Sequence, residues 1–338
     1  HDCFGQRMKS TEELAQSQKF GLKFTVNDNP WIPMDNIYLH PDFGYIRVEG
    51  LANDLPGTIA FLNTEMNSFI PTAEEFKSAQ GKFSQSMMHG GKDKAKDLFD
   101  ALVDSTLYGS TVKENDKALT YESLVKFARV YFTPENRLVS VVSPKSEEMV
   151  SKLLLAGAKS PAKTYPLTDK SYLKLDTPVY VDVPGGGERT YLFWGFVKNI
   201  DRGDEAALKA LGLILSDKII FDVREKQGLA YRMTATSAVR DDKALFYISL
   251  GTRPQNAEVL LPQFESLMSR QTLGELSEED VQKTINMYLG RMMFRRLSSI
   301  NQAYYLGTSL FFENEMNHDK AFLDALKAVT LEDVNRVA

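Results

Sequence analysis

The feature of the sequence that most constrains the fold is a series of segments that occurs twice in the same order. The two members of each pair are separated by about 205 residues. The pairs are residues 21–24 with 228–231, Gly50 with Gly251, 72–76 with 277–281, and 119–124 with 329–334. Four matches in one order at nearly one spacing are hard to attribute to chance. We therefore predict a repeated structural unit of about 205 residues.

The 338 residues hold less than two of these units, so the sequence predicts two similar domains that are both truncated. The first domain spans residues 1–144, a linker with Ser-Pro and Tyr-Pro steps spans 145–174, and the second domain spans 175–338. The second unit opens with a hairpin that the first lacks, and it lacks the closing strand that the first has at 136–142. We expect the chain to be a piece of a longer polypeptide.

Within each unit, segments with strand character lie toward both ends and long helices lie between them. This order predicts an α+β fold, in which helices pack on one face of a mostly antiparallel sheet. The expected strands are residues 22–26, 45–48, 136–142, 179–183, 190–197, 233–237 and 245–250, with hairpins turned at 184–187 and 240–243. The expected helices are residues 10–19, 59–69, 71–88, 97–107, 119–130, 147–155, 208–223 and 258–269, and one from 277 onward.

The composition argues against several classes of protein. A formal net charge of −5, with no basic block, argues against a nucleic-acid-binding protein. No apolar run approaches the roughly 18 residues of a membrane span. Cys3 is the only cysteine, and the four histidines are scattered with no pair at helical ligand spacing. No zinc or iron–sulfur site is therefore predicted in this chain.

Other familiar sites find no support in the sequence. No Gly-x-Ser-x-Gly motif surrounds a serine. Residues 184–187, Pro-Gly-Gly-Gly, lack the Lys-Ser/Thr of a phosphate-binding loop and are typical of a hairpin turn. Arg291, Arg295 and Arg296 indicate a solvated helix face, although they could also line an electropositive cavity.

The strongest candidate for a functional site is residues 221–231, where an apolar helix gives way to a strand. This stretch places a fixed cation, Arg224, and a phenol, Tyr231, on either side of the flexible Gly228. A structural interpretation accounts for the same residues: Arg224 would interact with the helix dipole, Gly228 would cap the helix, and Tyr231 would be a strand aromatic. The local pattern alone favours this structural interpretation.

Residues 224–231, Arg-Glu-Lys-Gln-Gly-Leu-Ala-Tyr, resemble the signature in the last domain of the insulinase/pitrilysin family of zinc metallopeptidases. Residues 119–128 and 131–138, Leu-Thr-Tyr-Glu-Ser-Leu-Val-Lys-Phe-Ala and Tyr-Phe-Thr-Pro-Glu-Asn-Arg-Leu, are similar to the family's domain ending. The likeness covers essentially the whole chain in the order of its elements, and residues 224–231 are its most specific part.

The resemblance implies four α+β domains that form two halves around a closed chamber, with zinc bound by His-x-x-Glu-His in the first domain. That motif is absent here. The resemblance therefore implies that this chain is the non-zinc half or a non-zinc subunit, inactive alone, and that zinc lies in a partner half on the same or another polypeptide. It also implies that Arg224 and Tyr231 project toward that zinc and complete a composite active site for peptide substrates.

The internal repeat favours a functional role for this pair. The corresponding positions of the first unit are Ser17 and Phe24, so the first unit keeps the fold pattern and lacks both polar groups. A capping role alone would not require that difference. The alternative is a non-catalytic structural or substrate-presenting subunit of a larger complex, as some relatives are. The isolated chain could form a homodimer, and a bacterial periplasm or cell envelope is the location that the resemblance suggests.

Overall fold

The structure, a computed structural model, describes residues 23–26, 43–67, 69–89, 94–109, 119–155, 172–173, 175, 177, 179–183, 188–230, 233–240, 242–267, 269 and 274–338. The chain forms two compact units, each made from separate stretches of sequence. Unit 1 comprises residues 1–91, 115–168 and 295–318, and unit 2 comprises residues 92–114, 169–294 and 319–338.

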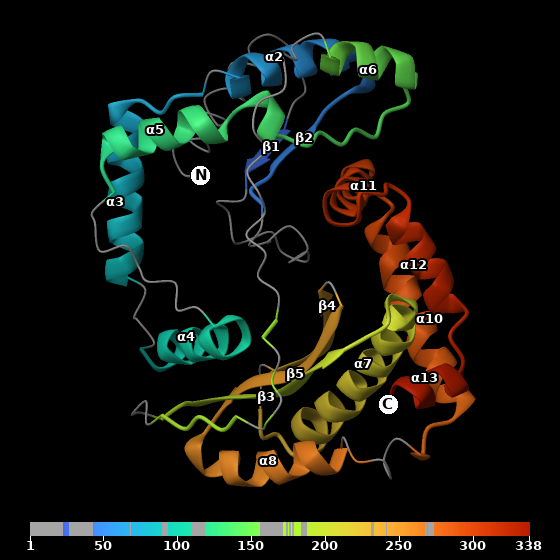
Figure 1. Ribbon diagram of the computed structural model, residues 1–338. Helices are drawn as coiled ribbons and strands as arrows, with labels where there is room; N and C mark the ends of the chain where they lie inside the picture. The colour runs from blue at the N-terminus through green and yellow to red at the C-terminus, as the bar shows by residue number, and fades with distance from the viewer. Residues whose placement is uncertain are drawn as a thin grey trace. The chain divides into compact units, whose positions relative to one another are not determined.

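Unit 1 contains a two-stranded antiparallel ladder and several helices (Figure 1). Its elements are β1 (Lys23–Val26), β2 (Ile46–Glu49), α2 (Leu55–Asn67), α3 (Ala73–His89), α5 (Tyr121–Tyr131), α6 (Glu147–Leu155) and α11 (Ser299–Glu313). The predicted strands at 22–26 and 45–48 are confirmed, and they pair from Lys23 with Glu49 to Val26 with Ile46. The helix predicted at residues 10–19 lies outside the described residues.

The core of unit 1 is centred on Phe69, which is 4% exposed. Phe132, from the turn after α5, packs edge-on against it with ring centroids 5.0 Å apart. Ile46 and Val48 of β2 pack against the same cluster. Helices α2, α3 and α5 thus share one apolar cluster with β2, as amphipathic helices on a sheet require.

Unit 2 contains a three-stranded antiparallel sheet in the order β3-β5-β4 (Figure 1). Its elements are α4 (Lys94–Tyr108), β3 (Thr190–Asn199), α7 (Glu205–Ile220), a π-helical turn (Phe221–Lys226), β4 (Met233–Arg240), β5 (Lys243–Thr252), α8 (Pro254–Leu267), α10 (Glu278–Arg295), α12 (His318–Lys327) and α13 (Leu331–Val337). The hairpin of β4 and β5 was predicted and is confirmed, with Arg240 opposite Lys243. The fold is therefore an α+β fold with an antiparallel sheet.

The central strand β5 separates two apolar clusters, because successive side chains of a strand point to opposite faces. Phe246, Ile248 and Leu250 belong to the larger cluster, which includes α7 and α8. Leu245 and Tyr247 belong to a smaller cluster that includes α4. In Figure 1, α7 and α8 accordingly cover one face of the sheet and α4 covers the other. The sequence predicted helices on one face only, so this is a correction.

Helix α7 lies close to strand β4. A Cβ atom at Gly212 would lie 2.3 Å from the Ser237 hydroxyl oxygen and 2.8 Å from its Cβ, so only glycine allows this approach. Along α7, Leu211, Leu215 and Ile219 are buried at intervals of four residues. Because these residues share one buried face, they fix the orientation of α7 on the sheet up to its C-terminal end.

Two predicted strands are wrong. Residues 179–183 form no ladder, and β3 pairs instead with β5, from Thr190 with Thr252 to Asn199 with Lys243. Val179, Tyr180, Val181 and Val183 are all exposed, so no buried face fixes a register for a hairpin. Residues 137–143 also lack a ladder, and Leu138 and Ser140 lie instead beside Gly307 of α11. The apolar run at 136–142 reflects packing on a helix rather than strand pairing.

Each compact unit includes one helix from the other half of the sequence. Helix α4 belongs to unit 2, where it covers the sheet, and α11 belongs to unit 1, where Phe311 packs edge-on against Phe43 at 5.5 Å. The domain boundaries predicted at residues 144 and 175 stay a prediction. No helix within the described ranges is long and apolar enough to cross a membrane.

Candidate functional site

The predicted site begins where α7 widens into the π-helical turn Phe221–Lys226. Val223 continues the buried row of α7 and is fully buried. The next residue, Arg224, projects from the surface with 45% of its side chain exposed. A π-helical turn is rare and occurs often at functional sites, because the extra residue per turn redirects side chains. The sequence pattern gave no signal for this turn.

Gly228 ends the helix in the left-handed conformation, with φ of 64°. Its N–H donates to the Arg224 carbonyl at 3.1 Å, and the Leu229 N–H donates to the Val223 carbonyl at 3.0 Å. These bonds satisfy carbonyls that the helix leaves without partners. The predicted C-cap role of Gly228 is confirmed.

Two polar residues hold the chain just before Tyr231. The Leu229 carbonyl accepts hydrogen bonds from Thr252 Oγ1 at 2.6 Å and Asn256 Nδ2 at 3.3 Å, and Asn256 also donates to Thr252 Oγ1 at 3.0 Å. Ala230 is buried at 4% exposure. Sequence reasoning missed Thr252 and Asn256, because they lie more than 20 residues from the carbonyl that they bind. The backbone is thus anchored up to residue 230.

Arg224 keeps hydrogen-bonding capacity that the fold does not use. Its Nε donates to Glu225 Oε1 at 2.7 Å, and no other partner for the guanidinium is found within the described part of the chain. Lys226, two residues on, is instead paired with Asp222 at 2.6 Å. The terminal nitrogens of Arg224 can therefore donate to a ligand at this surface.

Tyr231, the second predicted site residue, lies outside the described residues. The structure therefore does not test whether Arg224 and Tyr231 come together.

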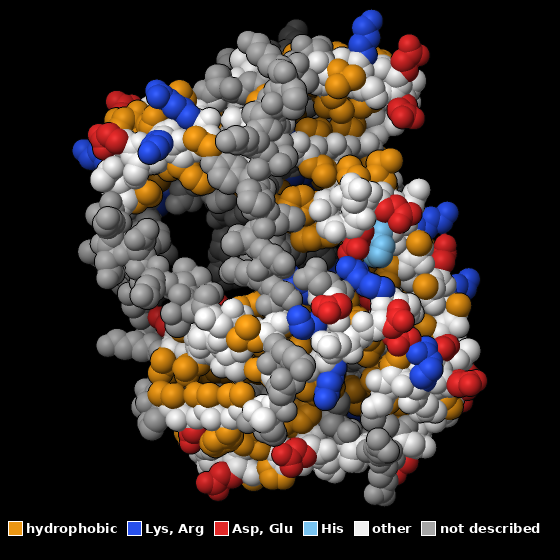
Figure 2. Space-filling model, viewed as in Figure 1, with side chains coloured by type: hydrophobic (Ala, Val, Ile, Leu, Met, Phe, Trp, Pro, Cys, Tyr) orange, Lys and Arg blue, Asp and Glu red, His pale blue; other side chains and the backbone are white. Residues whose placement is uncertain are grey.

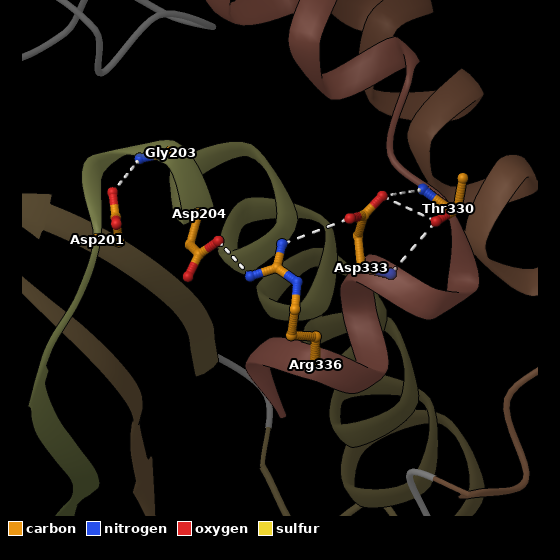
Figure 3. A network of polar contacts seen from close by, with 6 residues as sticks. All are labelled: Asp201, Gly203, Asp204, Thr330, Asp333 and Arg336. Atoms are coloured by element: carbon orange, nitrogen blue, oxygen red, sulfur yellow. Dashed lines mark hydrogen bonds and ion pairs between the residues drawn. The ribbon is translucent and has the colours of Figure 1, made fainter.

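A second polar network joins α13 to the start of α7 (Figure 3). Arg336 donates to Asp204, next to the start of α7, and its other terminal nitrogen donates to Asp333 at 3.4 Å. The Thr330 hydroxyl donates to Asp333 at 2.8 Å and lowers the pKa of this carboxyl group. Arg336 and Thr330 are exposed and the two carboxylates are partly exposed, so these contacts link the two helices at the surface rather than form a binding site.

The three arginines near the end of α10 do not share one environment. Arg291 is exposed, whereas Arg295 and Arg296 are partly buried. The guanidinium of Arg296 lies 3.9 Å from the ring centroid of Tyr305. The prediction of a single solvated face is therefore right for Arg291 only. Among the described residues, no group of three His, Cys, Asp or Glu side chains could hold a metal ion.

Comparison with known proteins identifies the class to which this fold belongs. The family model described as "Peptidase M16 inactive domain" matches residues 118–288, about half of the chain, including the π-helical turn and the residues that anchor the backbone before Tyr231. The chain belongs to the M16 peptidase family, the insulinase/pitrilysin family, and the matching domain is the type described as inactive. The resemblance seen in the sequence is confirmed. A search of curated proteins finds no match.

Several solved structures share the fold. A protease from Helicobacter pylori has a TM-score of 0.74 at 16% identity, over 96% of this chain and 80% of that one. The periplasmic protease PqqL from Escherichia coli has a TM-score of 0.69 at 14% identity, over 97% of this chain and 36% of that one. A peptidase M16 inactive domain from Pseudomonas fluorescens has a TM-score of 0.65 at 16% identity, over 94% of this chain and 77% of that one. The chain thus spans little more than a third of PqqL.

Proposed function

We propose that this chain is the non-zinc half of an M16 endopeptidase that degrades peptides, and that Arg224 and Tyr231 complete an active site whose zinc lies in a partner half. The observation that supports the proposal most strongly is the environment of Arg224. This residue stands exposed on a π-helical turn, inside the region that matches the family, and its terminal nitrogens have no partner among the described residues.

The proposed chemistry of this chain is hydrogen-bond donation. When a peptide carbonyl is attacked, negative charge develops on its oxygen, and a donor at that position stabilises the transition state by about 3–4 kcal/mol. Tyr231 is the proposed donor, and Arg224 would bind a neighbouring carbonyl or hold the tyrosine in place. Zinc in the partner half would supply the attacking water. We expect the chain alone to be inactive.

The proposal includes two related domains in this chain. Helix caps and helix lengths at corresponding positions of the two halves support it. Thr72 with Glu75 and Ser277 with Asp280 form reciprocal capping bonds at the starts of α3 and α10. Helices α4 and α11 each have 15 residues, and each belongs to the compact unit formed mainly by the other half of the sequence. These local similarities support the proposed repeat of about 205 residues.

Substitution in the assembled native enzyme tests the proposal. We expect Tyr231→Phe to lower kcat about 100-fold with little change in KM, because the lost hydrogen bond strengthens in the transition state. Arg224→Gln should lower kcat/KM about tenfold. Lys226→Gln is the matched control, because it removes a cation from the same turn and should leave turnover unchanged. Full turnover by Tyr231→Phe would show that this residue has no catalytic role.

A non-catalytic structural or substrate-presenting subunit is the second candidate, and the inactive type of the matching domain favours it. Such a subunit needs neither Arg224 nor Tyr231. Purification of a stable complex without any zinc-bearing peptidase partner would support this candidate over the first.

A further inference from the structure

Helix α10 separates its charges in an unusual way. Its acidic residues, Glu278, Glu279 and Asp280, all lie in the first turn, where the helix dipole favours them. Residues 281–296 contain four cations and no acid. Figure 2 shows acidic and basic side chains interspersed over the side of unit 2 where α10, α12 and α13 lie. A helix of this composition in a chain with net charge −5 indicates a local cationic surface.

The exposed side of α10 alternates cations with large apolar side chains. Lys283, Met287, Arg291 and Phe294 follow one another at three- and four-residue intervals, so they lie along one stripe of the helix. We call these four residues the α10 stripe. Met287 is 46% exposed and Phe294 is 77% exposed, while Ile285 on the opposite side is fully buried. Exposed apolar side chains lined up with cations are typical of an interaction surface.

Lys209 of α7 adds a third cation beside the stripe. Its ammonium group lies 5.4 Å from the ring centroid of Tyr288, on α10. Burial lowers the pKa of Lys209, the positive charge of Arg291 lowers it further, and Glu205 partly opposes both effects. Glu205, however, already lies 3.7 Å from Arg202. The charge of Arg291 thus acts on Lys209, and Glu205, which acts on Lys209 in the opposite sense, is also close to Arg202.

Neither Lys209 nor Arg291 forms a hydrogen bond or ion pair within the part of the chain that the structure describes. Holding a partly buried ammonium group beside another cation is unfavourable unless an anion pairs with it. A carboxylate near the two cations would offset this repulsion and could accept charge-assisted hydrogen bonds from them. The electrostatics of the site therefore complement an acidic ligand.

We propose that the α10 stripe, together with Lys209, is a docking surface for an acidic amphipathic helix of a partner polypeptide. The apolar side chains of that helix would cover Met287 and Phe294, and its carboxylates would pair with Lys209, Lys283 and Arg291. A flat membrane surface fits less well, because Lys209 is only partly exposed on α7. This surface is independent of the proposed peptidase role and uses none of its residues.

Fluorescence anisotropy with the full 338-residue chain tests the proposal. The probe is a labelled peptide of about 18 residues, five helical turns, with leucines on one face and glutamates flanking them. The comparison peptide has lysine in place of each glutamate. We expect only the acidic peptide to bind, and we expect its affinity to fall as salt is raised.

Variants locate the binding on the stripe. Arg291→Met, Lys209→Met and Phe294→Ser should each weaken binding about tenfold, because each removes one charged or apolar contact. Lys327→Met on α12 removes an exposed cation from the same unit and should change nothing. If Lys209→Met fails to fold, as judged by circular dichroism, the exposed Arg291→Glu replaces it and should abolish binding.

Three results would overturn the proposal. Equal binding of the acidic and basic peptides would show that charge does not select the ligand. Unchanged affinity in Arg291→Met and Phe294→Ser would place any binding elsewhere. Binding to vesicles that contain phosphatidylserine, lost in the same variants, together with no binding of the acidic peptide, would assign the surface to membranes instead.

Discussion

At the scale of single residues, the structure explains why Arg224 faces the solvent while its neighbour is buried. Val223 completes the apolar row of α7, and the π-helical turn then carries Arg224 to the surface. Different contacts hold the backbone that follows the turn, since Thr252 and Asn256 donate hydrogen bonds to the Leu229 carbonyl. We regard these two residues as positioning residues for the proposed site.

The substitution Thr252→Val tests that positioning role. Valine has nearly the same shape and removes the 2.6 Å hydrogen bond to the Leu229 carbonyl. We expect kcat of the assembled enzyme to fall about tenfold with KM unchanged, because small displacements of a catalytic group are costly. In a protein that already carries Tyr231→Phe, Thr252→Val should cause no further fall in kcat. A purely structural effect of Thr252→Val would instead add to the fall in kcat that Tyr231→Phe causes.

Gln263→Leu is the control for this measurement. It removes another polar contact of α8 with the same turn, the 3.0 Å amide pair between Gln227 and Gln263. This pair is exposed, and we expect its loss to leave kcat unchanged. An equal fall in kcat in Thr252→Val and Gln263→Leu would mean that kcat depends on the stability of the turn in general.

At the scale of elements, α4 packs on the sheet of unit 2 through tyrosines. Tyr172 is buried and stacks on Tyr108 of α4, with ring centroids 5.6 Å apart, and Tyr247 of β5 stacks on Phe193 at 5.2 Å. Burial is the main cause that raises the pKa of Tyr172 and of Tyr247, and Tyr108 raises both further. Both phenols are therefore held neutral in the folded protein.

This packing predicts a loss of stability at alkaline pH. In the unfolded chain a tyrosine titrates near pH 10. Since both folded pKa values are raised, their contribution to stability is fully present below about pH 10 and falls as pH rises above it. Urea unfolding between about pH 9 and 11 should show this decrease. In Tyr172→Phe the fall in the free energy of unfolding with pH should be smaller. An unchanged pH dependence in this variant would show that Tyr172 does not cause the loss of stability.

The helices predicted within the described residues were found, although α11 and α12 were not predicted, and part of the strand pairing was predicted wrongly. Helix signals are local: Thr120 with Ser123 and Thr330 with Asp333 form capping boxes that the sequence itself displays. Strand pairing depends on distant partners, so the apolar runs at 136–142 and 179–183 were assigned to strands that do not form. The same reason explains why Gly228 was predicted correctly and the contacts of Thr252 were missed.

For the whole molecule, the central question is whether this chain contributes to the active site of a larger peptidase. The family match establishes an M16 domain of the inactive type, and the chain covers only 36% of the PqqL chain. The sequence has no His-x-x-Glu-His motif. The proposed function therefore assigns the zinc to a partner half and the hydrogen-bond donors Arg224 and Tyr231 to this chain.

The most direct test compares peptide turnover and zinc content of the isolated 338-residue chain with those of the native assembly purified through it. We predict no turnover by the isolated chain. We also predict turnover by the assembly, with zinc on a polypeptide region that carries His-x-x-Glu-His. Peptide hydrolysis by the isolated chain at the rate of the assembly, or a native assembly with neither turnover nor such a motif, would contradict the account.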